Sequence, residues 1–456
     1  MRRVVKVSRI RIIITIIVVV LTTLLTGCTG KEPNKIAYVV ALGIDSTDDD
    51  NYKITIQYAN TTQISGGASE SGGKAGSEIV DNVTIEAPNI YAGVGLANNI
   101  VSKSFSMSHA KLIVFSKEIA EKGVKDMIET LVRSEEIRPD VFIAVANTTA
   151  NDYLTSVNPE MEVNPAQYYQ LIYQKNQLVG IPDGQLREFF TGLYTDNYDS
   201  ILPVAGVIEG SGGNSQNDDK GQSKDGQNEG SEGSSESLDS FESKSSNEKD
   251  ENEKEKDAEK NTSKYEYDIK NYVGGETAIE KKNKAEAIGA AVFEKDKMLG
   301  ELGEVETEIC KMLKGDYTYS YLTYYNNDTP DIPITVKTTQ QKKPKYKIDT
   351  DKKTVDIELY IESDLYSLPA DYNVENKIED FERDVANYTS SACTEFINNF
   401  TKKYNSDILK LNEKVKYKFL TNNQYNWFKK NVGWSEYKFS VCTNFKVRRT
   451  GLIVRE

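Results

Sequence analysis

Few of the side chains that commonly carry out catalysis occur in this chain. It has one histidine, His109, in the run SMSHAKLIVF at the start of a predicted strand, where a structural role is expected. It has no Gly-x-Ser-x-Gly elbow, phosphate-binding loop or EF-hand loop. Zinc sites need clustered ligands, whereas the cysteines are scattered. We therefore expect no catalytic residue, metal site or cofactor, and no enzymatic activity.

An acidic cluster, Asp45 with Asp48, Asp49 and Asp50, could hold a calcium ion. Neither the glycine nor the bidentate glutamate of a calcium loop follows it. A solvated hairpin turn is the preferred interpretation, because aspartates are common in turns. Gly93-Val94-Gly95 lies in a predicted helix and does not extend to a dinucleotide fingerprint, so we expect it to serve packing.

The position of Cys28 is informative. Five basic residues stand in the first eleven positions, an apolar run covers 12–25, and Leu25-Thr26-Gly27 leads directly into the cysteine. This order is typical of a secretory signal peptide, predicted over 1–27. The end of the run resembles the lipobox of bacterial lipoproteins, which implies that Cys28 carries acyl chains such as palmitate and that 28–35 is a tether. The alternative, an uncleaved anchor helix with an incidental cysteine, also places the remaining chain outside the cytoplasm.

Three further cysteines are Cys310, Cys393 and Cys442. An odd number cannot all pair within one chain, so unpaired thiols are the preferred interpretation. A Cys393–Cys442 bridge remains possible.

The negative charge is concentrated in one segment. Of the formal net charge of −14, residues 211–260 supply −8, from 15 acidic and 7 basic side chains. The same segment has almost no apolar residues, which predicts a disordered acidic insertion over 210–265. The remaining chain is close to neutral and lacks the basic face that nucleic-acid binding requires, so nucleic acid is not an expected partner.

The periodicity of the apolar residues predicts strands and helices in mixed order. Strands are expected at 36–44, 52–60, 79–86, 109–115, 140–145, 286–293, 297–302, 317–325, 333–347, 354–363 and 437–448. Helices are expected at 89–103, 117–132, most of 153–198, 304–313 and 374–404. The predicted fold class is α+β, with two to three domains of mixed sheets packed with helices. The expected boundaries are an N-terminal part over 36–209 and a C-terminal part over 266–456.

Several short blocks, taken in order, resemble the Ger(x)C family, the C subunits of spore germinant receptors. The blocks are Ala41-Leu42-Gly43-Ile44-Asp45, Ser108-His109-Ala110-Lys111, Ala120-Glu121-Lys122-Gly123-Val124, Gly289-Ala290-Ala291-Val292-Phe293, Tyr404-Asn405-Ser406-Asp407-Ile408, Trp427, Trp434 and Val447-Arg448-Arg449-Thr450-Gly451. The resemblance spans nearly all of the chain beyond Cys28 except the acidic segment.

The resemblance implies a membrane protein of sporulation, held by its lipid on the outer face of the inner membrane of the spore. It would work beside the membrane-embedded A and B germinant-receptor subunits in sensing small nutrients, without catalysis. Two further expectations come from the residues. Gly289 and Gly300 should allow close backbone approach around a hairpin, and Trp427 and Trp434 should anchor the core.

An alternative function is a lipid-anchored extracytoplasmic solute-binding protein. That class usually has two similar lobes joined by a hinge, whereas here the two halves differ in pattern. Titration of the isolated chain against amino acids separates the two hypotheses, because tight stoichiometric binding favours the alternative.

Overall fold

The computed structural model describes residues 14–18, 35–49, 51–60, 80–157, 162, 164–174, 180–195, 197–208, 271–277, 283–326, 329–367 and 377–450. Cys28, the tether up to residue 34 and the predicted insertion over 210–265 lie outside these residues, as does the signal peptide apart from a short helical stretch at 14–18. The described residues before 210 and those from 271 onward group into one compact unit.

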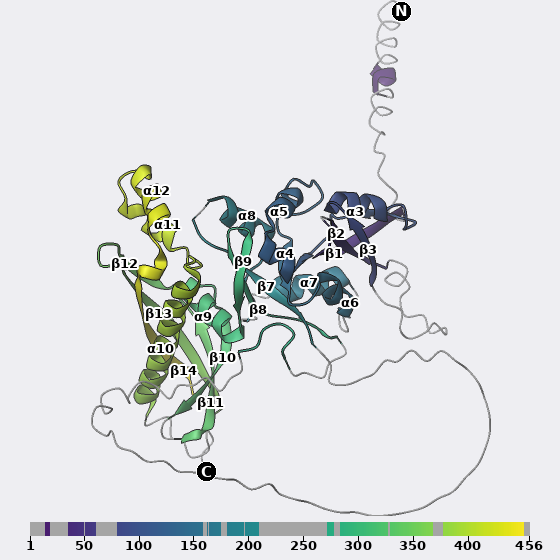
Figure 1. The fold of residues 1–456 in the computed structure, drawn as a ribbon. Coiled ribbons are helices and arrows are strands. Elements are labelled where there is room, and N and C mark those ends of the chain that lie inside the picture. Colours follow the sequence, from purple (N-terminus) through teal and green to yellow (C-terminus); the bar gives the residue numbers. More distant parts are fainter. Residues whose placement is uncertain are drawn as a thin grey trace, which may run out of the picture. The chain divides into compact units, whose positions relative to one another are not determined.

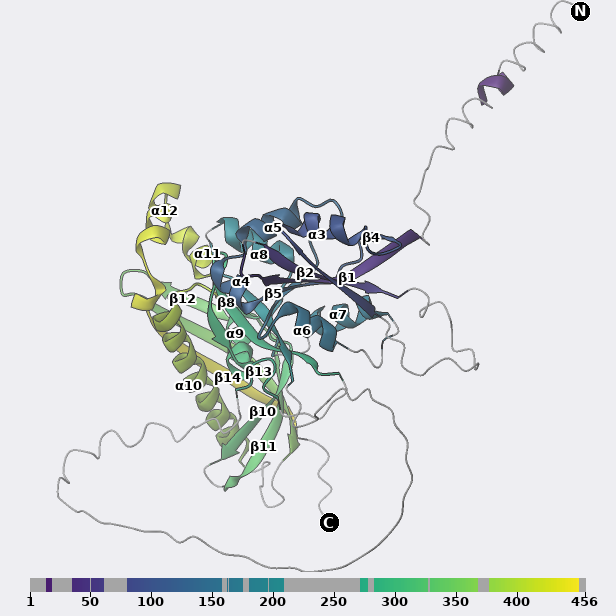
Figure 2. The same cartoon turned by 45° about the vertical axis from the view of Figure 1, so that its right-hand side comes forward.

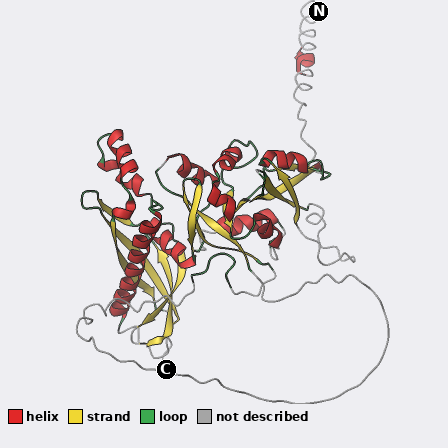
Figure 3. Cartoon of the chain, in the orientation of Figure 1, coloured by secondary structure: helices red, strands yellow, loops and turns green. Residues whose placement is uncertain are grey.

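Two β-sheets organise the described chain, with helices packed on both (Figures 1 and 3). The first has nine strands, in the order β3-β2-β1-β5-β6-β7-β8-β9 with β4 beside β1. Their bounds are β1 Ile36–Ser46, β2 Tyr52–Ala59, β3 Val80–Ala87, β4 Ser104–Ser106, β5 Leu112–Ser116, β6 Phe142–Ala146, β7 Ile201–Val207, β8 Ala285–Glu294 and β9 Lys297–Leu302. The α+β class is confirmed.

The centre of the first sheet is parallel, and its two sides are antiparallel. β1, β5, β6 and β7 pair in parallel, whereas β2 and β3 on one side and β8 and β9 on the other run antiparallel. Every residue of β5 and β6 is buried, as expected for continuous apolar strands covered on both faces.

Helices cover both faces of this sheet, as Figure 2 also shows. One core contains buried residues of α3 Ile90–Ala97, α4 Lys117–Lys122, α5 Lys125–Val132 and α8 Leu186–Thr195. A second core contains residues of α6 Ala150–Ser156 and α7 Pro165–Gln174. The single helix predicted over 117–132 is wrong. It is two helices, because Gly123 has φ of 124° and ends α4.

The first sheet takes strands from both sides of the predicted acidic insertion. β7, which the sequence analysis missed, precedes that segment, and β8 follows it and pairs antiparallel with β7. The C-terminal part expected from residue 266 therefore begins with two strands of the first sheet. The backbone at Gly274 packs directly against β7. A Cβ built on Gly206 would lie 2.0 Å from the carbonyl carbon of Gly274, so only glycine fits at this position.

The second sheet has five strands, ordered β10-β11-β13-β12, with β14 pairing in parallel with β13. The bounds are β10 Tyr319–Asn326, β11 Thr329–Gln340, β12 Lys345–Asp349, β13 Thr354–Ser367 and β14 Lys438–Arg449. The single strand predicted over 333–347 is wrong, because this stretch holds the end of β11 and the start of β12. β13 and β14 alternate buried and more exposed residues along most of their lengths, so one face of the sheet is covered.

The long helix α10, Ile378–Tyr404, packs against β14. Thr394 Oγ1 and Ser390 Oγ accept the backbone N–H groups of Val441 and Thr443, at 3.0 and 2.9 Å. One hydrophobic core joins α10, α9 Glu304–Lys314 and the second sheet to Ile201, Val292 and other residues of β7, β8 and β9. The two sheets therefore share a core.

The three described cysteines are free thiols. Cys310 and Cys393 are buried and Cys442 is exposed, which agrees with the preferred interpretation of unpaired thiols. Burial raises the pKa of Cys310 to about 11 and that of Cys393 to about 12, which makes both thiols poor nucleophiles.

Candidate functional site

The solvated turn predicted for the acidic cluster is wrong for Asp45, which is buried within β1. Asp45 is buried at the end of β1, and its carboxylate accepts the N–H groups of Ala150 at 2.6 Å and Asn151 at 3.0 Å, at the first turn of α6. Burial raises the pKa of this carboxyl. Asp48 and Asp49 lie in the turn after β1, and Asp50 lies outside the described residues. Over the described ranges, no group of three or more His, Cys, Asp or Glu side chains has an arrangement suited to a metal ion.

His109 lies edge-on to the ring of Tyr38, with centroids 4.9 Å apart. Gly289 has φ of 85°, and a Cβ there would lie 2.6 Å from the carbonyl oxygen of Leu302. A Cβ on Gly300 would meet the hydroxyl of Tyr404 at 2.5 Å. The close backbone approach expected at Gly289 is confirmed, whereas the close neighbour of Gly300 is the side chain of Tyr404 and not the backbone.

The two tryptophans differ. Trp434 is 3% exposed, as expected of a core anchor, and its Nε1 donates to Asn412 Oδ1 at 3.2 Å. Trp427 is 65% exposed, so its assignment to the core is wrong. Trp427 lies on the outer face of α12, Asn422–Asn431, whose inward residues are Tyr425 and Phe428.

A charged pocket of about 400 Å³ is lined by residues from the first sheet and its helices, from α9 and the turn after it, and from the segment after α10. We call it the junction pocket. Its charged lining residues are Asp183, Glu188, Lys311, Lys314, Asp316 and Lys410. α8 and the segment before it supply the first two, α9 and its C-terminal turn supply the next three, and the segment after α10 supplies Lys410.

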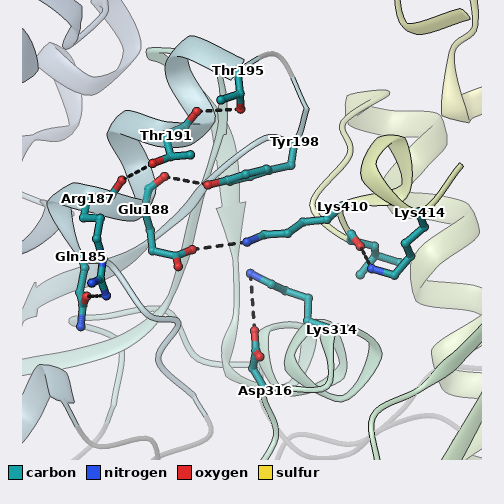
Figure 4. Close-up of polar contacts among 11 residues, drawn as sticks. Gln185, Arg187, Glu188, Thr191, Thr195, Tyr198, Lys314, Asp316, Lys410 and Lys414 are labelled. Carbon is teal, nitrogen blue, oxygen red and sulfur yellow. Dashed lines mark hydrogen bonds and ion pairs between the residues drawn. The ribbon is translucent and has the colours of Figure 1, made fainter. Parts of the chain in front are cut away.

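Lysines and carboxylates meet across this pocket (Figure 4). Lys410 Nζ lies 3.5 Å from Glu188 Oε2 and 4.2 Å from the centroid of the Tyr198 ring. Lys314 faces Asp316 at 4.0 Å. Lys311 is 5% exposed and donates to the carbonyl of Ile181 at 3.0 Å, and burial lowers its pKa.

Next to the pocket, two aspartates join the chain segments. Asp199 Oδ2 accepts the N–H of Asp407 at 2.8 Å, and the N–H of Asp199 donates to the carbonyl of Asp407 at 3.1 Å. We call this pair the aspartate clasp. Asp407 also accepts the N–H groups of Leu411 and Asn412, at 2.7 and 2.8 Å, at the start of α11, Leu411–Val415. The clasp therefore connects the segment just before β7 to the start of α11.

Burial dominates the electrostatics of the clasp. It raises the pKa of Asp407 to about 7, although the two N–H donors act in the opposite direction. The pKa of Asp199 is also raised by burial. Near the middle of α9, burial raises the pKa of Glu308 to about 7, and Ser320 Oγ donates to its carboxylate at 2.7 Å.

This arrangement can hold chain segments together and can receive a small polar molecule. The charged groups lining the pocket are three lysines and three carboxylates, so a ligand with both signs of charge would find partners for each. Asp407 belongs to the Tyr404–Ile408 block noted in the sequence, but the pocket residues come from distant segments and carry no common motif. Their proximity is a product of the fold.

The fold and this junction define a two-sheet α+β protein whose sheets share one core. Over the described ranges, no helix combines the length and apolar character needed to cross a membrane. Two family models match the chain in order. The spore germination protein N-terminal domain matches residues 30–207, and the C-terminal domain of the "Spore germination B3/GerAC like" family matches 288–451.

Curated relatives are similar over part of their length. Spore germination protein KC of Bacillus subtilis (strain 168) is 26% identical over 174 residues, 35% of this chain and 42% of the relative. The putative spore germination protein YfkR of the same strain is 28% identical over 145 residues, 32% of this chain and 37% of the relative. The alignments thus span less than half of each relative.

Among solved structures, the crystal structure of the GerBC protein has a TM-score of 0.47 and 14% identity, over 89% of this chain and 96% of that chain. The two matched domains and their order confirm the resemblance found in the sequence: the chain belongs to the Ger(x)C family of spore germination proteins.

Proposed function

We propose that this protein is the lipid-anchored C subunit of a spore germinant receptor and that it acts by binding other proteins, without catalysis. The observation that carries the proposal is the occurrence of both spore-germination domains, in order, in one chain. The charged groups at the junction support a non-catalytic role, because those of the clasp are engaged in holding chain segments together.

The anchor is the lipidated thiol of Cys28. Ile36, the first residue of β1, comes eight residues after Cys28, which at roughly 3.5 Å per extended residue gives a maximum reach of about 28 Å. Two or three acyl chains would hold the protein stably, since each buried methylene contributes about 0.8 kcal/mol. The folded part would thus stay close to the outer face of the inner membrane of the spore, next to the membrane-embedded A and B subunits.

Deletion of the gene tests the proposed function. Mutant spores should lose the response to a particular set of small nutrients and keep a normal response to germinants that act through other receptors or bypass them. The response is measured as the loss of optical density of the spore suspension and the release of dipicolinic acid. An intact copy of the gene should restore it. Spores that lack the protein and still respond normally to every germinant would refute a receptor role.

A further inference from the structure

The segment between β13 and β14 ends in a small projecting unit with an unusual surface. Residues 411–433, which we call the tip, contain α11, a short 3-10 turn at Lys416–Lys418, and α12. Tyr417 is 93% exposed and Leu420 is 94% exposed, the two highest values among the large apolar side chains of the described residues. Trp427, at 65%, is third within the tip.

The exposed side chains stand on a packed aromatic base. Phe419 lies 4.9 Å from Phe428, Phe428 lies 6.0 Å from Trp434, and Trp434 lies 4.7 Å from Tyr437, measured between ring centroids. Tyr425 donates to the carbonyl of Asn412 at 3.1 Å. The tip therefore buries Tyr425 and Phe428, whereas Tyr417, Leu420 and Trp427 remain exposed to solvent. Such exposure of large apolar groups indicates a surface that contacts something else.

The tip is basic in an acidic protein. It holds five lysines and one acidic residue, Glu413, a formal charge of +4, whereas the whole chain has −14. Lys414 donates to the carbonyl of Leu409 at 2.7 Å, and Lys429 donates to Asn197 Oδ1 at 3.2 Å. Lys416 and Lys430 are exposed, and each lies within three residues of Tyr417 or Trp427 in the sequence. Lysines flanking exposed aromatic and leucine side chains are typical of segments that bind anionic membrane surfaces.

The position of the tip is consistent with contact to the membrane that carries the anchor. In both views α12 and the start of β1 lie toward the same side of the folded unit, and the β10–β11 hairpin lies toward the other (Figures 1 and 2). The tether joins Cys28 to β1. A protein held by its first strand would thus present the tip to the same bilayer, at a high effective concentration.

We propose that the tip is a second, reversible membrane contact, in which Tyr417, Leu420 and Trp427 enter the interface of an anionic bilayer and Lys416 and Lys430 meet lipid phosphates. This proposal rests on the proposed function, because the lipid anchor is what places the protein close to a membrane. It fixes the orientation of the second sheet relative to the bilayer, which a flexible tether alone cannot do.

The test uses the chain from Thr29 onward, which keeps both sheets, carried on vesicles by an N-terminal hexahistidine tag and a nickel-chelating lipid. This artificial tether makes the result independent of whether Cys28 is lipidated. The chain has only two tryptophans, and Trp434 is buried, so the emission lost in Trp427→Phe belongs to Trp427. Phosphatidylglycerol brominated near the headgroup end of its acyl chains should quench that emission, and the vesicles should shield it from aqueous iodide.

Three comparisons separate the contributions of the lipid charge, the lysines of the tip and its exposed apolar side chains. Replacing the anionic lipid with neutral phosphatidylcholine should abolish the bromine quenching, and so should the variant Lys416→Glu/Lys430→Glu. The control variant Lys284→Glu/Lys342→Glu changes two exposed lysines outside the tip by the same charge. It should leave the quenching unchanged. Tyr417→Ser/Leu420→Ser should weaken it, and Tyr321→Ser/Tyr366→Ser, at exposed tyrosines of β10 and β13, should not. An unchanged Trp434 emission confirms folding.

The proposal is overturned if iodide quenches Trp427 equally on anionic vesicles and in free solution. It is also overturned if Trp427 becomes shielded only when membrane-embedded receptor subunits are added, since the tip would then bind protein. The wild-type comparison of anionic with neutral lipid requires no substitution, so it decides the question even if a variant fails to fold.

Discussion

Replacing Asp407 with alanine should lower the free energy of unfolding at pH 5 by about 2–4 kcal/mol, because it leaves buried N–H groups without an acceptor, at about 1–3 kcal/mol each. The groups affected are the N–H donors of Leu411 and Asn412 at the start of α11. Urea unfolding, monitored by the fluorescence of Trp434, measures this loss of stability, because Trp434 is hydrogen-bonded to Asn412. The matched control Asp351→Ala, at an exposed turn, should change stability by less than about 0.5 kcal/mol.

The same residue predicts a pH dependence with a definite sign. The folded-state pKa of Asp407 is about 7, above the ordinary value of 3.8, so the folded protein binds this proton more tightly than the unfolded chain. The stabilisation is complete below the unfolded pKa and is lost as the pH rises through about 7, at up to about 1.4 kcal/mol per pH unit. Asp407→Asn should flatten the fall in stability between pH 4 and 7. An unchanged slope would show that Asp407 is not the titrating group.

Replacing Cys28 with alanine should release the mature chain from the membrane, because the thiol is the proposed attachment point for the acyl chains. In fractionated cells, the wild-type protein should sediment with membranes and require detergent for extraction. The variant should either appear in the soluble extracytoplasmic fraction or keep an uncleaved N-terminus of higher mass. The control Cys442→Ala, at an exposed thiol of β14, should leave localisation unchanged. Full membrane retention of a processed Cys28→Ala chain would exclude a lipid anchor at this residue.

Periodic segments were predictable because burial imposes their pattern. The hairpin of β1 and β2, the hairpin of β8 and β9, and the helices α9 and α10 all follow from alternation or helical spacing of apolar residues. β7 was missed because its apolar run, ILPVAGV, contains Pro203 and Gly206, which are usually unfavourable in a strand. Its pairing with β8 depends on a contact across the acidic segment, which no local pattern encodes.

The site was less predictable than the fold. Asp45 stands out in the sequence as one of an acidic cluster, yet its partner is the first turn of α6, about 105 residues away. The clasp joins Asp199 to Asp407, 208 residues apart. Asp199 belongs to no motif, and the Tyr404–Ile408 block that contains Asp407 does not indicate its partner. Trp427 was assigned to the core by residue type alone. The helical spacing of Tyr425, Phe428 and Val432 could have shown that the other face of α12, with Trp427, points outward.

Purification of this protein in its lipidated form from spore membranes, in mild detergent, tests the receptor assignment most directly. Mass spectrometry should identify two membrane-embedded germinant-receptor subunits in constant ratio with it, and an N-terminal peptide that begins at a diacylglycerol-modified Cys28. A chain that purifies alone, with an unmodified cysteine and in the cytosolic fraction, would contradict both the anchor and the receptor complex.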